Sequence, residues 1–172
     1  TVHMVMALLI VAFILYLIFA TKTSFQLQKY HSFFYTLLVI GIVLTLIQII
    51  LGTQVRQFVD EQTKMMGYEK SLWLAQPKLD FYIHRSTSIL VLIINGYLWF
   101  INRKLNLGYK KINLVLGCIL LEVFTGIMMY YFDFPFLSQP IHLVIASILF
   151  GIQMYILLEI IHQKKMINKT IA

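Results

Sequence analysis

Residues 33–55 read FFYTLLVIGIVLTLIQIILGTQV and contain no Asp, Glu, Lys or Arg. A helix of about 20 mostly apolar residues crosses the roughly 30 Å hydrocarbon core of a bilayer, so this run predicts a transmembrane helix. Four further runs have the same character, at roughly residues 3–20, 82–101, 112–132 and 140–161. The sequence therefore predicts an all-α fold, a polytopic transmembrane helical bundle of five spans.

The composition excludes several other classes of protein. Of the 172 residues, 60% are hydrophobic and only 12% are charged, whereas soluble domains are about half apolar and a quarter charged. A soluble globular domain and a disordered chain are thereby excluded, and the single cysteine excludes a disulfide scaffold. The net charge of +7 is carried between apolar runs rather than in a patch with aromatic residues, so membrane lipid is the expected partner and nucleic acid is not.

The distribution of basic residues predicts the orientation in the membrane. Residues 21–32, 102–111 and 163–172 contain Lys or Arg but no Asp or Glu. The positive-inside rule assigns such segments to the cytoplasm, which predicts an N-terminus outside the cell and a C-terminus in the cytoplasm. The expected location is the cell's plasma (inner) membrane. Residues 56–81 then form a large external loop, either an amphipathic cap on the outer face or an ordinary solvated loop. A short helix near Trp73 should end before Pro77.

Three histidines, His3, His84 and His142, begin spans at the predicted outer face. Each is followed four residues later by a small residue, which on a helix lies on the same face and leaves space beside the imidazole. These small residues are Ala7, Ser88 and Ala146.

The two spans without an outer histidine share a different pattern. Gln48 precedes Gly52 by four residues, and Glu122 precedes Gly126 by four. The alternation of the two patterns along the chain predicts a bundle built from a repeated pair of helices.

Histidines within membrane spans are costly and tend to be functional. His84 and His142, on two facing helices, could hold a haem iron from both sides, and we favour this over interface histidines that hydrogen-bond a neighbouring helix. Zinc is disfavoured because no H-x-x-x-H spacing or carboxylate pair accompanies them. Arg56 and Arg85 either bind haem propionates or reach the interface and pair with acidic neighbours.

Two further polar residues lie inside spans. Glu122 could relay protons or hydrogen-bond a haem edge, but a neutral carboxyl joining two helices is slightly favoured. Gln48 is read as a helix-joining side chain as well.

Several of these residues also carry a family resemblance. The run Leu51-Gly52-Thr53-Gln54-Val55-Arg56, the start Ile83-His84-Arg85, and Pro140-Ile141-His142-Leu143 together resemble the haem A synthase family of cytochrome oxidase biogenesis, over nearly the whole chain. The family has eight helices in two similar four-helix halves, each holding a haem between two histidines. It oxidises a methyl group of haem O to the formyl group of haem A.

The resemblance implies a role for each segment. Residues 33–162 correspond to the second four-helix half, with His84 and His142 as the axial ligands of a haem b cofactor. Residues 1–20 correspond to the last helix of the preceding half, with His3 matching a ligand of the haem O substrate site, and residues 163–172 to a cytoplasmic tail. The chain is thus expected to be the C-terminal portion of a haem A synthase, incomplete on its own, with no catalytic residue identified. Haem O synthase and an electron donor are expected partners.

Two other functions remain open at this stage. The chain could be a b-type cytochrome that transfers electrons from quinol without modifying haem. It could also be a non-redox membrane assembly factor whose outer histidines bind no haem.

Overall fold

The computed structural model describes residues 2–25, 28–67 and 69–171. Within these ranges the secondary structure is entirely helical, which confirms the predicted fold class. Thr1 and Ala172, the outermost residues of the predicted segments 1–20 and 163–172, lie outside the described ranges. The elements are α1 (Val2–Ala20), α2 (Ser32–Met66), the 3₁₀ helix η1 (Lys70–Leu72), α3 (Leu79–Lys104), α4 (Ile112–Tyr131) and α5 (Ser138–Ile171).

Among the described residues, four helices are long and apolar enough to cross a membrane: α1, α2, α4 and α5. The prediction of five spans therefore holds for four by length and composition, and α3 is not among them. With 26 residues α3 is long enough, but its second and third turns contain the polar run His84-Arg85-Ser86-Thr87-Ser88. It also carries Asn95 and Asn102, and both amides are buried in the bundle.

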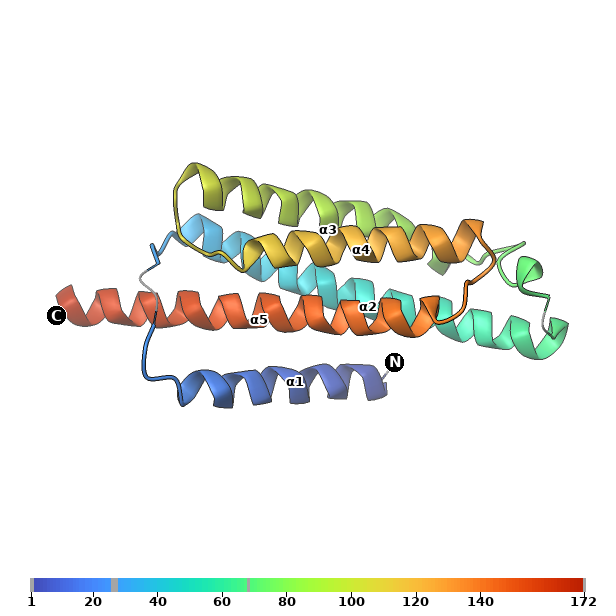
Figure 1. Ribbon diagram of the computed structural model, residues 1–172, viewed down its shortest axis with the longest axis horizontal. Helices are drawn as coiled ribbons and strands as arrows, with labels where there is room; N and C mark the ends of the chain where they lie inside the picture. The colour runs from blue at the N-terminus through green and yellow to red at the C-terminus, as the bar shows by residue number, and fades with distance from the viewer. Residues whose placement is uncertain (1, 26–27, 68, 172) are drawn as a thin grey trace.

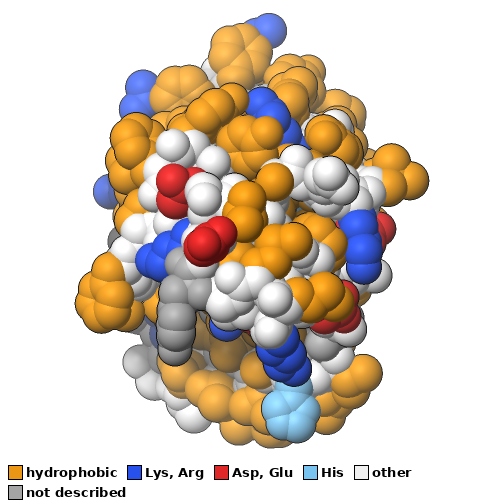
Figure 2. All heavy atoms as spheres, turned by 90° about the vertical axis from the view of Figure 1, so that its right-hand side faces the viewer, with side chains coloured by type: hydrophobic (Ala, Val, Ile, Leu, Met, Phe, Trp, Pro, Cys, Tyr) orange, Lys and Arg blue, Asp and Glu red, His pale blue; other side chains and the backbone are white. Residues whose placement is uncertain are grey.

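The helices run back and forth along one axis, so the connecting segments alternate between two ends (Figure 1). The α1–α2 link, the α3–α4 link and the C-terminus share one end, and these are the three basic segments. The N-terminus and the α2–α3 and α4–α5 links share the other end. Figure 2 faces that second end, where acidic and basic side chains are interspersed with hydrophobic ones. The charge asymmetry seen in the sequence is thus an asymmetry between the two ends of the folded bundle.

The prediction of a loop at residues 56–81 is wrong for the start of this segment, because α2 continues without interruption to Met66. Arg56 Nε lies 2.8 Å from Asp60 Oδ1, a pairing of residues four apart that supports a helix. The helix stops at Gly67, whose φ of 65° is a conformation that glycine adopts without a steric penalty.

The rest of that segment folds against the end of the bundle. Trp73 packs with Val59 of α2 and Phe134 of the α4–α5 link in a small hydrophobic cluster. The Trp73 indole N–H donates to the Gly67 carbonyl at 3.1 Å, and the Lys70 ammonium donates to the Phe134 carbonyl at 2.9 Å. Of the two interpretations from sequence, these contacts favour the cap, and η1 ends before Pro77 as expected.

The main core lies between α2, α3, α4 and α5, with α2 packed most extensively on α3 and α4 on α5. One buried polar contact crosses its middle: the Gln153 amide donates to Asn95 Oδ1 at 3.0 Å, with both residues almost inaccessible to solvent. Such interhelical hydrogen bonds join helices where packing against lipid supplies no hydrophobic driving force. Helix α1 packs chiefly on α5 at the side of the bundle and contributes Leu8 to the core.

A second polar cluster closes the basic end of the bundle. Lys111 Nζ lies 2.6 Å from Glu159 Oε1, and the Gln28 amide donates to the other oxygen of Glu159 at 3.3 Å. Burial and the nearby Glu159 carboxylate raise the pKa of Tyr109, in the α3–α4 link, to about 12. This cluster connects α5 to both links at that end.

Candidate functional site

A cavity of about 660 Å³ lies among the helices, and its lining includes Arg56, Asp60 and Leu74 of the segment 56–81. Cofactor and small-molecule sites occupy about 300–1,000 Å³ and are mostly apolar with a few placed polar groups. The cavity fits that description in part, because most of its lining residues are aliphatic or aromatic. The polar and charged residues that matter for its chemistry are Gln48, Arg56, His84, Arg85, Glu122 and His142.

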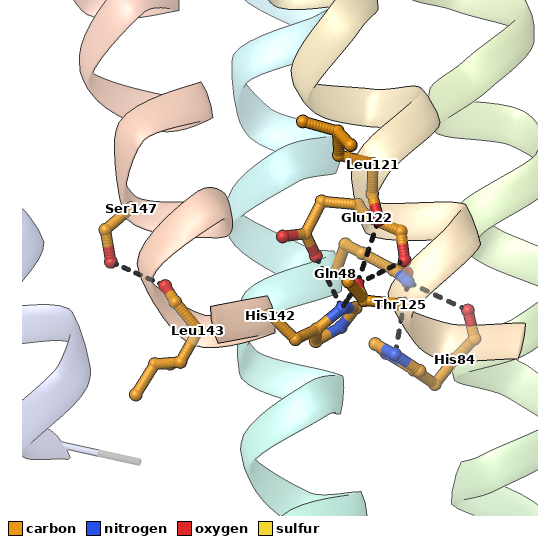
Figure 3. A network of polar contacts seen from close by, with 8 residues as sticks. All are labelled: Gln48, His84, Leu121, Glu122, Thr125, His142, Leu143 and Ser147. Atoms are coloured by element: carbon orange, nitrogen blue, oxygen red, sulfur yellow. Dashed lines mark hydrogen bonds and ion pairs between the residues drawn. The ribbon is translucent and has the colours of Figure 1, made fainter. Parts of the chain in front are cut away.

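His84 enters the cavity from the second turn of α3. The Gln48 amide of α2 donates to the His84 backbone carbonyl at 3.0 Å, and its nitrogen lies 3.5 Å from His84 Nε2 (Figure 3). His84 Nδ1 is buried and has no hydrogen-bond partner among the described residues. The imidazole is therefore held chiefly through its backbone, and its ring nitrogens remain largely uncommitted.

His142 enters the same cavity from the first turns of α5. Its Nδ1 lies 2.8 Å from the Thr125 hydroxyl and 3.1 Å from Glu122 Oε2, both on α4 (Figure 3). The contacts to α4 involve one ring nitrogen and leave Nε2 for another partner.

Each histidine also lies against a glycine of the preceding helix. A Cβ atom built on Gly52 would lie 3.2 Å from His84 Cε1 and within 4 Å of both ring nitrogens. A Cβ on Gly126 would lie 3.9 Å from His142 Cε1. Gly52 is therefore required for the close approach of the His84 ring, whereas Gly126 leaves ordinary contact distance.

Two of the three small residues predicted beside the histidines line the cavity, and the third lies apart together with His3. Ser88 and Ala146 line the cavity, four residues beyond His84 and His142. His3 and Ala7 are exposed on α1, and the residue of that turn that reaches the cavity is Met4. The structure thus brings His84 and His142 together and leaves His3 apart, so a role for His3 in another site stays a prediction.

Both predicted arginines line the cavity, with different surroundings. Arg56 pairs with Asp60, and both side chains are about half exposed, at 52% each. The Arg85 guanidinium lies 5.6 Å from the centre of the Tyr130 ring. Within the described residues no carboxylate lies within 4.0 Å of the Arg85 guanidinium. Arg85 is therefore the better placed of the two to receive an anionic group at the cavity mouth.

The donor set limits which metal chemistry is possible. Among the described residues no group of three or more His, Cys, Asp or Glu side chains is arranged to hold a metal ion. A structural zinc site takes four such ligands, whereas an iron already held by a porphyrin needs only one or two axial ligands from the protein. The pair of imidazoles fits the second case.

Thr125, whose hydroxyl contacts His142 directly, was not predicted from the sequence. The signal was available, because Thr125 follows Glu122 by three residues and so lies on the same helix face. Gln48 and Glu122 were singled out but read as helix-joining residues. The structure places each of them against one of the two histidines.

Comparison with known proteins adds one finding. The family model described as "Cytochrome oxidase assembly protein" matches residues 1–154, which is most of the chain. No curated protein and no solved structure matched the chain.

Proposed function

The chain belongs to the family of cytochrome oxidase assembly proteins, the haem A synthase family, and from this premise we propose that it is part of a haem A synthase. In this proposal the parent enzyme oxidises a methyl group of haem O to the formyl group of haem A. The four helices α2–α5 hold a haem b cofactor between His84 and His142, with haem O bound elsewhere in the parent protein. A role in cytochrome oxidase assembly and a multi-pass membrane location follow from the family and the apolar helices.

One observation carries the proposal: two imidazoles from different helices line a single apolar cavity of about 660 Å³. The orphaned Nδ1 of His84 and the absence of a Cβ at Gly52 supply room and an uncommitted ligand on one side. Nε2 of His142 supplies a ligand on the other. Arg85, and Arg56 if it exchanges its partner Asp60, would bind the propionates by charge-assisted hydrogen bonds. These features fit a bis-histidine haem.

When bound, the haem would supply one-electron redox chemistry. The chain's own residues would hold the haem and shield it from water. His84 and His142 would hold the iron, and the apolar wall, which includes Val91, Ile119 and Leu149, would exclude water from it. Removal of water strengthens the electrostatic interactions inside a site, so the few polar groups of the cavity have a larger influence there than they would at the surface.

The orientation belongs to the proposal as well. The basic end of the bundle would face the cytoplasm, by the positive-inside rule. The histidine cavity would then open near the outer face of the plasma membrane. An electron donor would have to reach it from there or from within the bilayer.

Haem binding by the purified chain tests the proposal. We expect a Soret band with a low-spin bis-histidine spectrum, which is lost in His84→Ala and in His142→Ala because each removes one of two axial ligands. His162→Ala is the matched control and should leave the band unchanged. The His162 ring stacks on Phe25, with the two ring centres 3.9 Å apart, and His162 does not line the cavity.

The substrate assignment needs a second readout. Haem extracted from cells that express the full-length parent together with a haem O synthase should contain haem A. A Soret band without haem A would favour a b-type cytochrome, and the absence of any band would favour a non-redox assembly factor.

A further inference from the structure

His142 Nδ1 lies against two oxygen atoms of α4. The Thr125 oxygen is 2.8 Å away, and the same hydroxyl also lies 2.9 Å from Leu121 O and 3.1 Å from Glu122 O, either of which can accept its single hydrogen. Glu122 Oε2 is 3.1 Å from Nδ1. A proton on Nδ1 would satisfy both oxygens and leave the lone pair on Nε2 for the cavity.

We propose that Glu122 is a positioning residue for His142: it accepts the Nδ1 proton's hydrogen bond, fixes the ring so that Nε2 faces the cavity, and makes that imidazole the stronger electron donor of the pair. The inference rests on the proposed haem site and adds a partner to one of its ligands. Metal-bound histidines generally donate their second ring N–H to a carboxylate or carbonyl, which orients the ring and raises its basicity.

The surroundings of Glu122 support a role inside the site rather than only between helices. Its side chain is 16% exposed, and its second oxygen, Oε1, is buried with no hydrogen-bond partner among the described residues. A carboxyl group that only joined two helices would be expected to pair both oxygens. In Glu122 one oxygen, Oε2, contacts His142, and the other is left without a hydrogen-bond partner among the described residues.

The other histidine has no equivalent partner. Gln48 is held on the His84 backbone carbonyl, and His84 Nδ1 has no hydrogen-bond partner in the described residues. The two axial ligands are therefore expected to differ, with a carboxylate behind His142 and none behind His84. A donor strengthened by a carboxylate stabilises the oxidised, more positive iron, so Glu122 should lower the midpoint potential of the haem.

The test is a redox titration of the haem-loaded chain, followed in its visible absorption bands. We expect Glu122→Gln, which keeps the shape and replaces the carboxyl group by an amide, to raise the midpoint potential. Glu122→Ala should raise it further and weaken haem binding about tenfold, at the lower end of the 10–100-fold loss typical of such outer partners. Glu122→Asp should restore part of the wild-type potential, which a merely structural role would not predict.

The matched control is Glu159→Gln, the same exchange at another buried carboxyl group. Glu159 lies 17 residues along α5 from His142, about 25 Å at 1.5 Å per residue, so its replacement should not change the potential. A potential for Glu122→Gln equal to that of wild type, with haem still bound, would overturn the inference and leave the proposed function standing. A wild-type chain with no Soret band would overturn both.

A second measurement needs no variant of Glu122. ¹⁵N NMR of the haem-free chain labelled in histidine, with the signal assigned through His142→Ala, should show His142 with a protonated Nδ1. A protonated Nε2 would refute the hydrogen-bond assignment even if Glu122→Gln failed to fold.

Discussion

Replacement of Gly52 by alanine tests the packing on which the His84 side of the cavity depends. In an exposed helix interior, alanine is favoured over glycine by about 0.8–1.0 kcal/mol. At Gly52 the added Cβ would lie 3.2 Å from His84 Cε1, whereas carbon atoms pack best at about 3.5–4.0 Å. Either the His84 ring or α2 must therefore move by about 0.3–0.8 Å.

Such overpacking costs about 1–3 kcal/mol, so the net effect of Gly52→Ala should lie between neutral and about 2 kcal/mol destabilising. Gly96 and Gly117 are the matched controls, because a Cβ at either position meets nothing within 4 Å. There the same substitution should stabilise by up to about 1 kcal/mol. Gly126→Ala, with its Cβ 3.9 Å from His142 Cε1, should behave like the controls.

Thermal unfolding in detergent and haem occupancy measure the two consequences separately. We expect Gly52→Ala to have a lower midpoint than Gly96→Ala and a reduced Soret absorbance, since His84 is displaced from its place in the cavity. If Gly52→Ala stabilised the chain as much as Gly96→Ala and kept full haem occupancy, the close contact between α2 and the His84 ring would be refuted.

Three further predictions concern the contacts that hold the bundle together. Replacing Lys111 by Met should destabilise the chain by about 1–3 kcal/mol, which is less than the cost of breaking a fully buried pair because the Lys111 side chain is 37% exposed while that of Glu159 is 7% exposed. The double variant with Glu159→Gln should recover most of that loss, and equal stabilities for the single and double variants would contradict the ion pair. A double-mutant cycle of Asn95→Ala and Gln153→Ala should give a coupling of about 0.6–1.7 kcal/mol, and strict additivity would mean that the 3.0 Å contact contributes nothing. Because burial raises the pKa of Tyr109 to about 12, the neutral Tyr109 side chain contributes its full stabilisation below about pH 10, the pKa of an unperturbed tyrosine, and this stabilisation is lost as the pH rises toward 12. An absorbance titration at high pH should show one late-ionising tyrosine that Tyr109→Phe removes.

Much of the fold was predictable because apolar runs of membrane length are a strong signal. The predicted runs lie within the observed helices to within about one residue, and the histidine-bearing ends of α3 and α5 fall where expected. The continuation of α2 to Met66 was missed because hydropathy falls sharply after Val55. Charge pairing four residues apart, as in Arg56 and Asp60, keeps a helix intact after it has ceased to be apolar.

The grouping of His84 and His142 in one cavity was predictable from the sequence, but the side chains that contact their rings were less so. His84 and His142 could be grouped because both follow segments at the same end of the bundle, and depth follows from topology. Which side chain lies beside each ring depends on helix rotation and crossing, and hydropathy says nothing about either. Thr125 was overlooked for this reason, and His3 could not be separated from the other two until α1 was seen to pack on α5 with His3 exposed.

The two helix pairs use one arrangement with one chemical difference. In each, the first helix carries a polar residue and, four residues later, a glycine that faces the imidazole of the second helix: Gln48 and Gly52 face His84, and Glu122 and Gly126 face His142. Because the backbone arrangement repeats, the presence of an amide in one pair and a carboxyl group in the other changes the surroundings of one histidine while the two backbone arrangements stay alike.

Exchanging the two side chains in the double variant Gln48→Glu, Glu122→Gln therefore distinguishes an effect of packing from an effect of the carboxyl group. If the amide and carboxyl act only as packing groups, haem potential and occupancy should stay at wild-type values. If the carboxyl acts through the ring nitrogen that it contacts, the potential should rise toward that of Glu122→Gln, because the shorter contact of the Gln48 side chain, at 3.0 Å, is to the His84 backbone carbonyl, and its contact to His84 Nε2 is longer, at 3.5 Å.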